Sequence, residues 1–162
     1  MHVVTHFRNK RESGEMSSLS EGVSRFAKVF VSPVANVTAR IFVGLEFFRS
    51  GMSKIENWEE TVEGFHDQWI VPFLTTNFAA PLATVVELIL PIMLIFGFFT
   101  RLAGFGLFCF VMVIEFVIFN GSGENLRHYY WMLIFALITG YGGDKISLDN
   151  FLFKKKKRYR FD

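Results

Sequence analysis

Four apolar stretches, separated by patches of charge, constrain this chain more than any other feature of its sequence. They cover residues 34–53, 78–99, 102–119 and 126–142. A helix needs roughly 20 residues, at a rise of 1.5 Å each, to cross the hydrocarbon core of a bilayer. Runs of this length are too long for the core of a small globular domain. The pattern predicts an all-α membrane protein, a four-helix bundle with the lipid bilayer around it.

Lysine and arginine are distributed unevenly between the ends of these stretches. Thirteen of them lie in the N-terminal arm, in the short connection near Arg101 or after the last stretch, whereas the other two connections hold only Lys54 and Arg127. Because basic loops tend to stay in the cytoplasm, both termini and the tight hairpin at Thr100 and Arg101 are predicted to be cytoplasmic. The other two connections are then predicted to face outward.

Three segments follow from this topology: a cytoplasmic arm over 1–33, a four-helix membrane domain over 34–149 and a basic cytoplasmic tail over 150–162. Within the arm, apolar residues at helical spacing over 17–32, behind a Ser18-x-x-Glu21 capping box, predict a short amphipathic helix on the membrane surface. A disordered arm is the alternative. The basic tail follows a hydrophobic segment, which favours an anionic membrane surface over nucleic acid as its neighbour.

The connection over 54–77 is acidic and predicts a second surface helix. It places Val62, Phe65 and Trp69 at helical spacing, so one side of that helix is aromatic. This side is expected to rest either on the outer leaflet or over the mouth of the bundle.

Ionisable side chains within the apolar stretches are the best candidates for function. Each costs at least about 2.5–3.5 kcal/mol at the centre of a membrane helix, so it normally faces protein or water and has a partner. Arg40 lies in the inner half of the membrane. The predicted topology brings the others into the outer half, at Glu46, Arg49, Glu87, Glu115, His128 and Tyr129.

The first stretch presents two polar faces. Gly44 and Gly51 lie on one face, together with Arg40, Phe47 and Lys54, and let another helix approach closely. Glu46 and Arg49 lie one turn apart on another face, where they can pair with each other. Either Arg49 extends outward to the interface, or this second face meets a partner subunit or a second copy of the chain.

Glu87 lies four residues before Pro91, and proline removes the hydrogen bond that the Glu87 carbonyl would accept. A polar pocket is one interpretation. A carboxylate clamped by Arg40 or Arg49 to fix helix register is a second, and a protonated, unpartnered glutamate is a third.

Glu115 and His128 form either a proton relay or half of a metal site completed by Glu87 and His66. A hydrogen-bonded interfacial histidine is the simpler account, and no metal is predicted. Cys109 is the single cysteine, which excludes dithiol chemistry within the chain.

Three ordered motifs resemble the signatures of the DoxX family of small four-helix membrane proteins. The first is Arg40-x-x-x-Gly44 followed by Phe48-x-x-Gly51-x-x-Lys54, and the second is Glu87 leading through Gly97 to Thr100-Arg101. The third comprises Tyr130-Trp131 and then Gly142-Gly143-x-Lys145-Ile146-Ser147-Leu148-Asp149. The resemblance covers roughly residues 34–152. It implies a bacterial inner-membrane protein whose relatives include the membrane subunit of a thiosulfate:quinone oxidoreductase.

The resemblance therefore implies an oxidoreductase subunit linked to quinone. No flavin, haem or iron–sulfur motif is present, so electrons would come from a partner. On this hypothesis Glu87 and Glu115 accept protons and His128 acts with them, while the quinone-binding residues are Arg40, Arg49, Tyr129 and Trp131. A non-catalytic scaffold or assembly factor that recruits a soluble partner is the alternative, and a small permease is a third.

Overall fold

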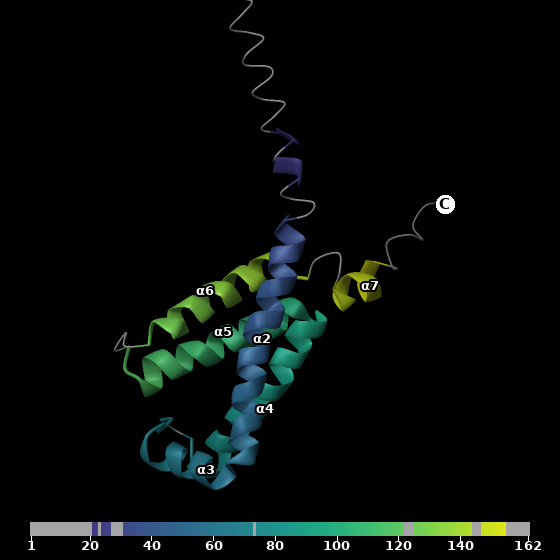
Figure 1. Ribbon diagram of the computed structural model, residues 1–162. Helices are drawn as coiled ribbons and strands as arrows, with labels where there is room; N and C mark the ends of the chain where they lie inside the picture. Colours follow the sequence, from purple (N-terminus) through teal and green to yellow (C-terminus); the bar gives the residue numbers. More distant parts are fainter. Residues whose placement is uncertain are drawn as a thin grey trace, which may run out of the picture. The chain divides into compact units, whose positions relative to one another are not determined.

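The computed structural model describes residues 21–22, 24–26, 31–72, 74–121, 125–143 and 147–154, with the backbone alone for 152–154. The regular elements in these ranges are helices, and their order is α2 (Ser32–Glu56), α3 (Trp58–Asp67), α4 (Thr76–Phe96), α5 (Thr100–Val113), the π-helical η2 (Ile114–Ile118), α6 (Leu126–Tyr141) and α7 (Leu148–Lys154) (Figure 1). The chain divides into two units, Met1–Ala35 and Asn36–Asp162. The predicted amphipathic helix over 17–32 falls largely outside the described residues, among which 21–22 and 24–26 are helical.

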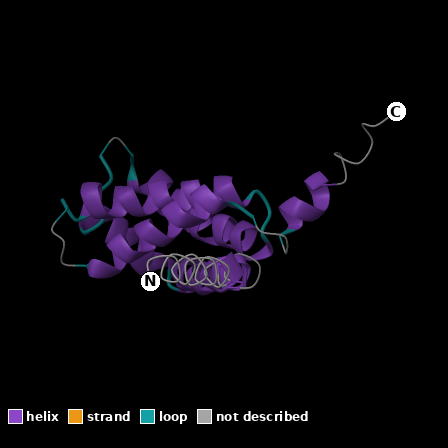
Figure 2. Cartoon of the chain, turned by 90° about the horizontal axis from the view of Figure 1, so that it is seen from above, coloured by secondary structure: helices purple, strands orange, loops and turns teal. Residues whose placement is uncertain are grey.

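The four predicted stretches correspond to α2, α4, α5 with η2, and α6, and Figure 2 shows helix throughout the regular elements of the described chain. The all-α prediction is confirmed. Two of these helices, α4 with 21 residues and Thr100–Ile118 with 19, are long and apolar enough to cross a membrane. In contrast, α2 carries three charged residues in its middle and α6 has only 16 residues. Four spans therefore remain a prediction, of which two helices satisfy length and composition.

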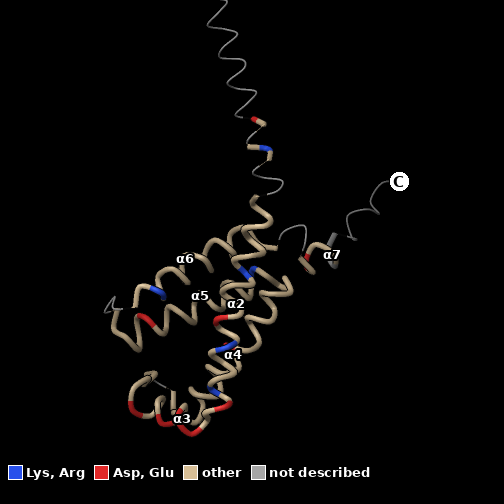
Figure 3. Tube along the Cα trace, viewed as in Figure 1, with Lys and Arg blue, Asp and Glu red and all other residues tan. Residues whose placement is uncertain are grey.

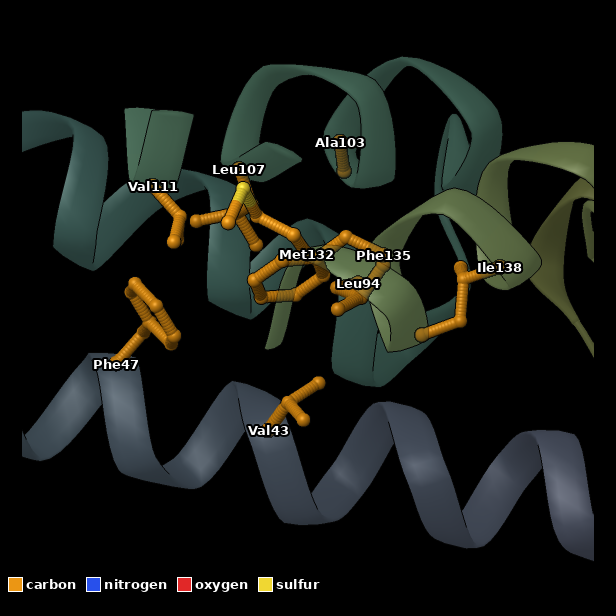
Figure 4. Close-up of a cluster of buried hydrophobic side chains, with 9 residues drawn as sticks. All are labelled: Val43, Phe47, Leu94, Ala103, Leu107, Val111, Met132, Phe135 and Ile138. Atoms are coloured by element: carbon orange, nitrogen blue, oxygen red, sulfur yellow. The ribbon is translucent and has the colours of Figure 1, made fainter. Parts of the chain in front are cut away.

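The larger of two apolar clusters in the described residues receives side chains from all four of these helices. Figure 4 shows nine buried side chains turned toward one another, namely Val43 and Phe47 from α2, Leu94 from α4, Ala103, Leu107 and Val111 from α5, and Met132, Phe135 and Ile138 from α6. The opposite faces carry large exposed apolar groups such as Phe78, Phe105 and Leu133. Soluble proteins rarely expose so much contiguous apolar surface, whereas lipid is a suitable solvent for it.

The close approach of α2 to α4 depends on two glycines, as the sequence predicted. A Cβ atom at Gly44 would lie 2.6 Å from Cγ1 of Ile95, and one at Gly51 would lie 2.9 Å from Cδ2 of Leu88. Contacts this short would force Ile95 or Leu88 to shift, so glycine at these positions allows the observed approach of the two helices. The second contact lies three residues, about one turn, before Lys54 on α2 and beside Glu87 on α4.

The turn between α4 and α5 is held by a residue from far along the chain. Both carboxylate oxygens of Asp149 accept hydrogen bonds, from the backbone N–H of Phe99 at 2.7 Å and from the N–H and hydroxyl of Thr100, each at 2.9 Å. The backbone N–H of Asp149 donates to the Gly97 carbonyl at 3.0 Å. Gly97 ends α4 with a φ of 70°, where glycine is favoured. We call Gly97, Phe99, Thr100, Ser147 and Asp149 the hairpin end.

The acidic connection forms the predicted second surface helix, α3, along which acidic residues gather (Figure 3). Its Phe65 side chain packs against Ala79, Ala80 and Ala83 at the start of α4. Trp69 lies just beyond the helix, where its ring meets that of Phe65 edge-on with centroids 5.5 Å apart. Phe65 and Trp69 also line a cavity between the helices. The aromatic side of α3 thus lies over the mouth of the helical domain, one of the two predicted locations.

Candidate functional site

A cavity of about 660 Å³ lies between α2, α3, α4, α5 with η2, and α6. Most of its wall is apolar, and its aromatic members are Phe47, Phe65, Trp69, Phe110, Phe119 and Trp131. Polar side chains enter at two main positions, one at Lys54 and Glu87 and the other at His128. A cavity of this size, largely apolar with a few polar groups, is typical of a small-molecule site.

The first polar position is an ion pair between α2 and α4. Nζ of Lys54 lies 2.6 Å from Oε2 of Glu87 and also donates to Oγ of Ser50 at 2.9 Å. The Glu87 side chain is 5% exposed and that of Lys54 is 17% exposed. The Gly51 contact sets this geometry, because it brings α2 against α4 one turn before Lys54. A buried carboxylate thus faces the cavity with a cation beside it.

The second polar position is a buried pair between η2 and α6. Nδ1 of His128 lies 2.7 Å from Oε2 of Glu115, and both side chains are almost fully buried. Glu115 belongs to the π-helical turn Ile114–Ile118, an arrangement that is rare and often found at functional sites. The sequence predicted this pairing, and the structure brings the two side chains together.

The two aromatic candidates on α6 flank this pair. The Tyr129 side chain also interacts with the Glu115 carboxylate by a hydrogen bond. Trp131 lines the cavity, and its ring meets the Phe47 ring edge-on with centroids 5.0 Å apart. The His128 ring lies 5.5 Å from the Trp131 ring. Both predicted aromatic residues therefore lie next to the buried histidine.

The two arginine candidates lie elsewhere, which corrects the prediction that they hold the carboxylates. The Arg40 guanidinium lies against Gly97 at the hairpin end, about four turns or ~20 Å along α2 from Lys54. Arg49 is 74% exposed, and its Nη1 lies 3.8 Å from Oε1 of Glu46, whose side chain is 43% exposed and also lines the cavity. The pairing of Glu46 with Arg49 is confirmed. The partner of Glu87 is Lys54 instead, because the glycine face of α2 meets α4 and the Arg49 face does not.

Lys54 was not predicted as a candidate residue of this site, although a signal for it was present. Lys54 continues the face of α2 that carries Gly44 and Gly51, and that face was predicted to approach another helix. The prediction assigned Lys54 to an outer loop, whereas α2 continues to Glu56. Because α2 extends three residues beyond its predicted end, Lys54 belongs to the helix and pairs with the buried Glu87 carboxylate.

The metal-site alternative is not formed in the part of the chain that the structure describes. No group of three or more His, Cys, Asp or Glu side chains is close enough there to hold an ion. His66, a further ligand considered in that alternative, is exposed on α3 and pairs with the neighbouring Asp67. Glu115 and His128 therefore act here as a hydrogen-bonded pair.

Long apolar helices with exposed apolar faces, and ionisable groups turned into a cavity between them, define a helical membrane protein. The family model of DoxX matches residues 35–120. The chain belongs to the DoxX family.

Two relatives extend over most of the chain. An uncharacterized protein of Haemophilus influenzae (strain ATCC 51907 / DSM 11121 / KW20 / Rd) is 32% identical over 134 residues, which cover 76% of this chain and 86% of the relative. A Bacillus subtilis (strain 168) protein named "Putative oxidoreductase CatD" is 28% identical over 127 residues, which cover 76% of this chain and 91% of the relative. No solved structure gives a significant match.

Proposed function

We propose that this protein is the membrane subunit of an oxidoreductase complex and that its cavity takes the head group of a quinone. The observation that carries the proposal is the apolar cavity with two buried ionisable pairs, Lys54 with Glu87 and Glu115 with His128. A quinone needs apolar walls for its ring and tail and polar groups that exchange protons with its oxygens. The Bacillus subtilis relative named as an oxidoreductase supports the same class of function.

The residues with proposed roles, His128 and Glu87, lie on two sides of the cavity. His128 faces the cavity with one ring nitrogen held by Glu115, so its other nitrogen is available to a quinone oxygen. Glu87 faces the same space from α4. When bound, a quinone accepts two electrons and two protons and becomes a quinol. Electrons come from a soluble partner, because the chain carries no flavin, haem or iron–sulfur motif.

The proposal includes an orientation. Both termini and the hairpin end face the cytoplasm, where most of the lysines and arginines lie, as the distribution of charge indicates. The cavity and α3 then lie toward the opposite surface of the membrane. A reporter fused after Asp162 that is active only outside the cytoplasm is expected to stay inactive.

Substitution of Glu87 by Gln tests the function. In complex purified in mild detergent, we expect E87Q to reduce quinone at least about tenfold more slowly, equivalent to ~1.4 kcal/mol, because an amide cannot exchange the proton. The matched control is E56Q, since Glu56 is exposed at the end of α2 and lies on neither polar position of the cavity. The quinone content and the visible spectrum of the wild-type complex show which quinone and which coloured cofactors co-purify with it.

Two results would count against different parts of the proposal. Unchanged turnover in E87Q would remove Glu87 from the chemistry, and wild-type complex without quinone and without quinone reduction would remove the activity itself. A scaffold predicts a different outcome, in which E87Q lowers the amount of protein while the activity of each surviving complex stays constant.

A further inference from the structure

A second cavity lies directly beside the first and shares its wall with it. It measures about 500 Å³ and is bounded by the end of α2 and by α3. Its lining is polar, with Ser53, Asn57, Glu60, Glu63 and Asp67 among its members. We call this space the vestibule. Ser50, Lys54 and Trp69 line both the vestibule and the apolar cavity.

The shared wall is built around the buried ion pair. Lys54 spans it, with Nζ bound to Ser50 at 2.9 Å and to Glu87 at 2.6 Å. Glu87 lines the apolar cavity but not the vestibule. A proton that travels from the vestibule to the cavity by this route therefore meets Lys54 first and Glu87 second.

We propose that the Lys54–Glu87 pair is the gate at which protons pass between the vestibule and the quinone in the cavity. This inference rests on the proposed function. One quinone takes up two protons, and two electrons from a flavin, haem or iron–sulfur centre of the partner, to give one quinol. Each proton that leaves the gate for a quinone oxygen is replaced from water of the vestibule, so the pair returns to its starting state. Glu87 is the group that faces the quinone, and Lys54 is a positioning residue that links Glu87 to the vestibule.

The charges around the gate fit this direction of transfer. Glu60, Glu63 and Asp67 of α3 line the vestibule, and a wall of carboxylates raises the local concentration of protons and cations. On the other side, the charged and titratable groups of the cavity are Glu46 from α2 and Arg127 and His128 from α6. His128, which is hydrogen-bonded to Glu115, lines the apolar cavity but not the vestibule.

Cysteine accessibility tests whether the two spaces connect. In a background in which the single cysteine is removed by C109S, S50C places a thiol in the shared wall, and the matched control S53C places one in the vestibule alone. A membrane-impermeant cationic methanethiosulfonate is added to proteoliposomes. We expect both thiols to react from the same side, and a short-chain ubiquinone to slow S50C at least about fivefold while S53C keeps its rate.

The possible outcomes separate the gate from the function. If S53C reacts and S50C does not, the vestibule is closed from the cavity and the gate is wrong. If both thiols react and ubiquinone slows neither reaction, the shared wall is open to the vestibule but quinone does not occupy the cavity. That result would contradict the proposed function.

Proton uptake tests the gate itself. During ubiquinone reduction by the complex in proteoliposomes, pyranine on either side of the membrane reports which side becomes alkaline, and S53C labelling identifies the vestibule side. We expect two protons per quinone to be taken from the vestibule side, and uptake to slow at least about tenfold in E87Q with partial recovery in E87D. Alkalinisation of the opposite side, or a normal rate in folded E87Q, would overturn the gate while leaving quinone reduction in place.

Discussion

The hairpin end and the cavity each place a carboxylate among polar partners, and the two carboxylates have different surroundings. Asp149 is partly exposed and accepts three hydrogen bonds from Phe99 and Thr100. Glu87 has Lys54 as its ion-pair partner and faces about 660 Å³ of cavity. A carboxylate whose oxygens are occupied by backbone and hydroxyl donors stabilises a turn, whereas one beside a cavity can meet a ligand. The comparison predicts that substitutions at the hairpin end change stability and those at the cavity change binding.

The largest effect on stability is expected from D149A. Loss of an acceptor for two backbone N–H groups and a hydroxyl is expected to cost about 3 kcal/mol, or roughly a 5–10 °C fall in Tm. Thermal unfolding in detergent, followed by tryptophan fluorescence, measures it. Quinone affinity per folded molecule is expected to stay normal. The control is E59A on the exposed side of α3. An equal fall in Tm there would show that the loss of a negative charge, and not the loss of the Asp149 hydrogen bonds, lowers the stability.

An intermediate effect is expected from G51A, which lies where the cavity is assembled. The new Cβ meets Leu88 at 2.9 Å and the Glu87 carbonyl carbon at 3.2 Å, and overpacking of this kind costs about 1–3 kcal/mol. Because α2 moves, Lys54 is displaced from Glu87 and quinone affinity also falls. The control is G140A on α6, where a Cβ meets nothing within 4 Å. Equal behaviour of the two variants in Tm and in binding would contradict the contact between α2 and α4.

The smallest effect is expected at the exposed pair on α2, Glu46 with Arg49. Arg49 and Glu46 are 74% and 43% exposed, and pairs of this type one turn apart contribute about 0.2–0.5 kcal/mol. A double-mutant cycle of R49Q and E46Q, followed by Tm in detergent, measures the coupling. A coupling above about 1 kcal/mol would indicate that a partner subunit or a second copy covers this face, and cross-linking from position 49 would then identify it.

The helices and most of the site could be predicted from the sequence because both depend on local spacing. Apolar length predicted α4 and α5, glycine spacing predicted the face of α2 that approaches α4, and the positions of Glu115 and His128 predicted their meeting. The partner of Glu87 could not be predicted in this way. It depends on which face of α2 meets α4 and on where α2 ends, and both follow from packing between elements.

The role of Asp149 depends on contacts between residues that are even further apart in the sequence than Lys54 and Glu87. The third motif was visible in the sequence, but the residues it contacts, Phe99 and Thr100, lie about fifty positions earlier. Spacing along the chain gives no sign that this carboxylate caps α5. Helix α7, which carries Asp149, was likewise hidden because its residues were interpreted as the start of a basic tail.

The π-helical turn at Ile114–Ile118 has a consequence for how this protein is aligned with its relatives. Phe119 donates its N–H to the carbonyl five residues earlier, at 3.1 Å, so the turn holds one residue more than an α turn. Residues on either side of it are therefore out of phase by about 100° relative to an uninterrupted helix. A relative with one residue fewer in this stretch would need another side chain to take the place of Glu115 opposite the imidazole, so an ungapped alignment would pair residues that are not equivalent.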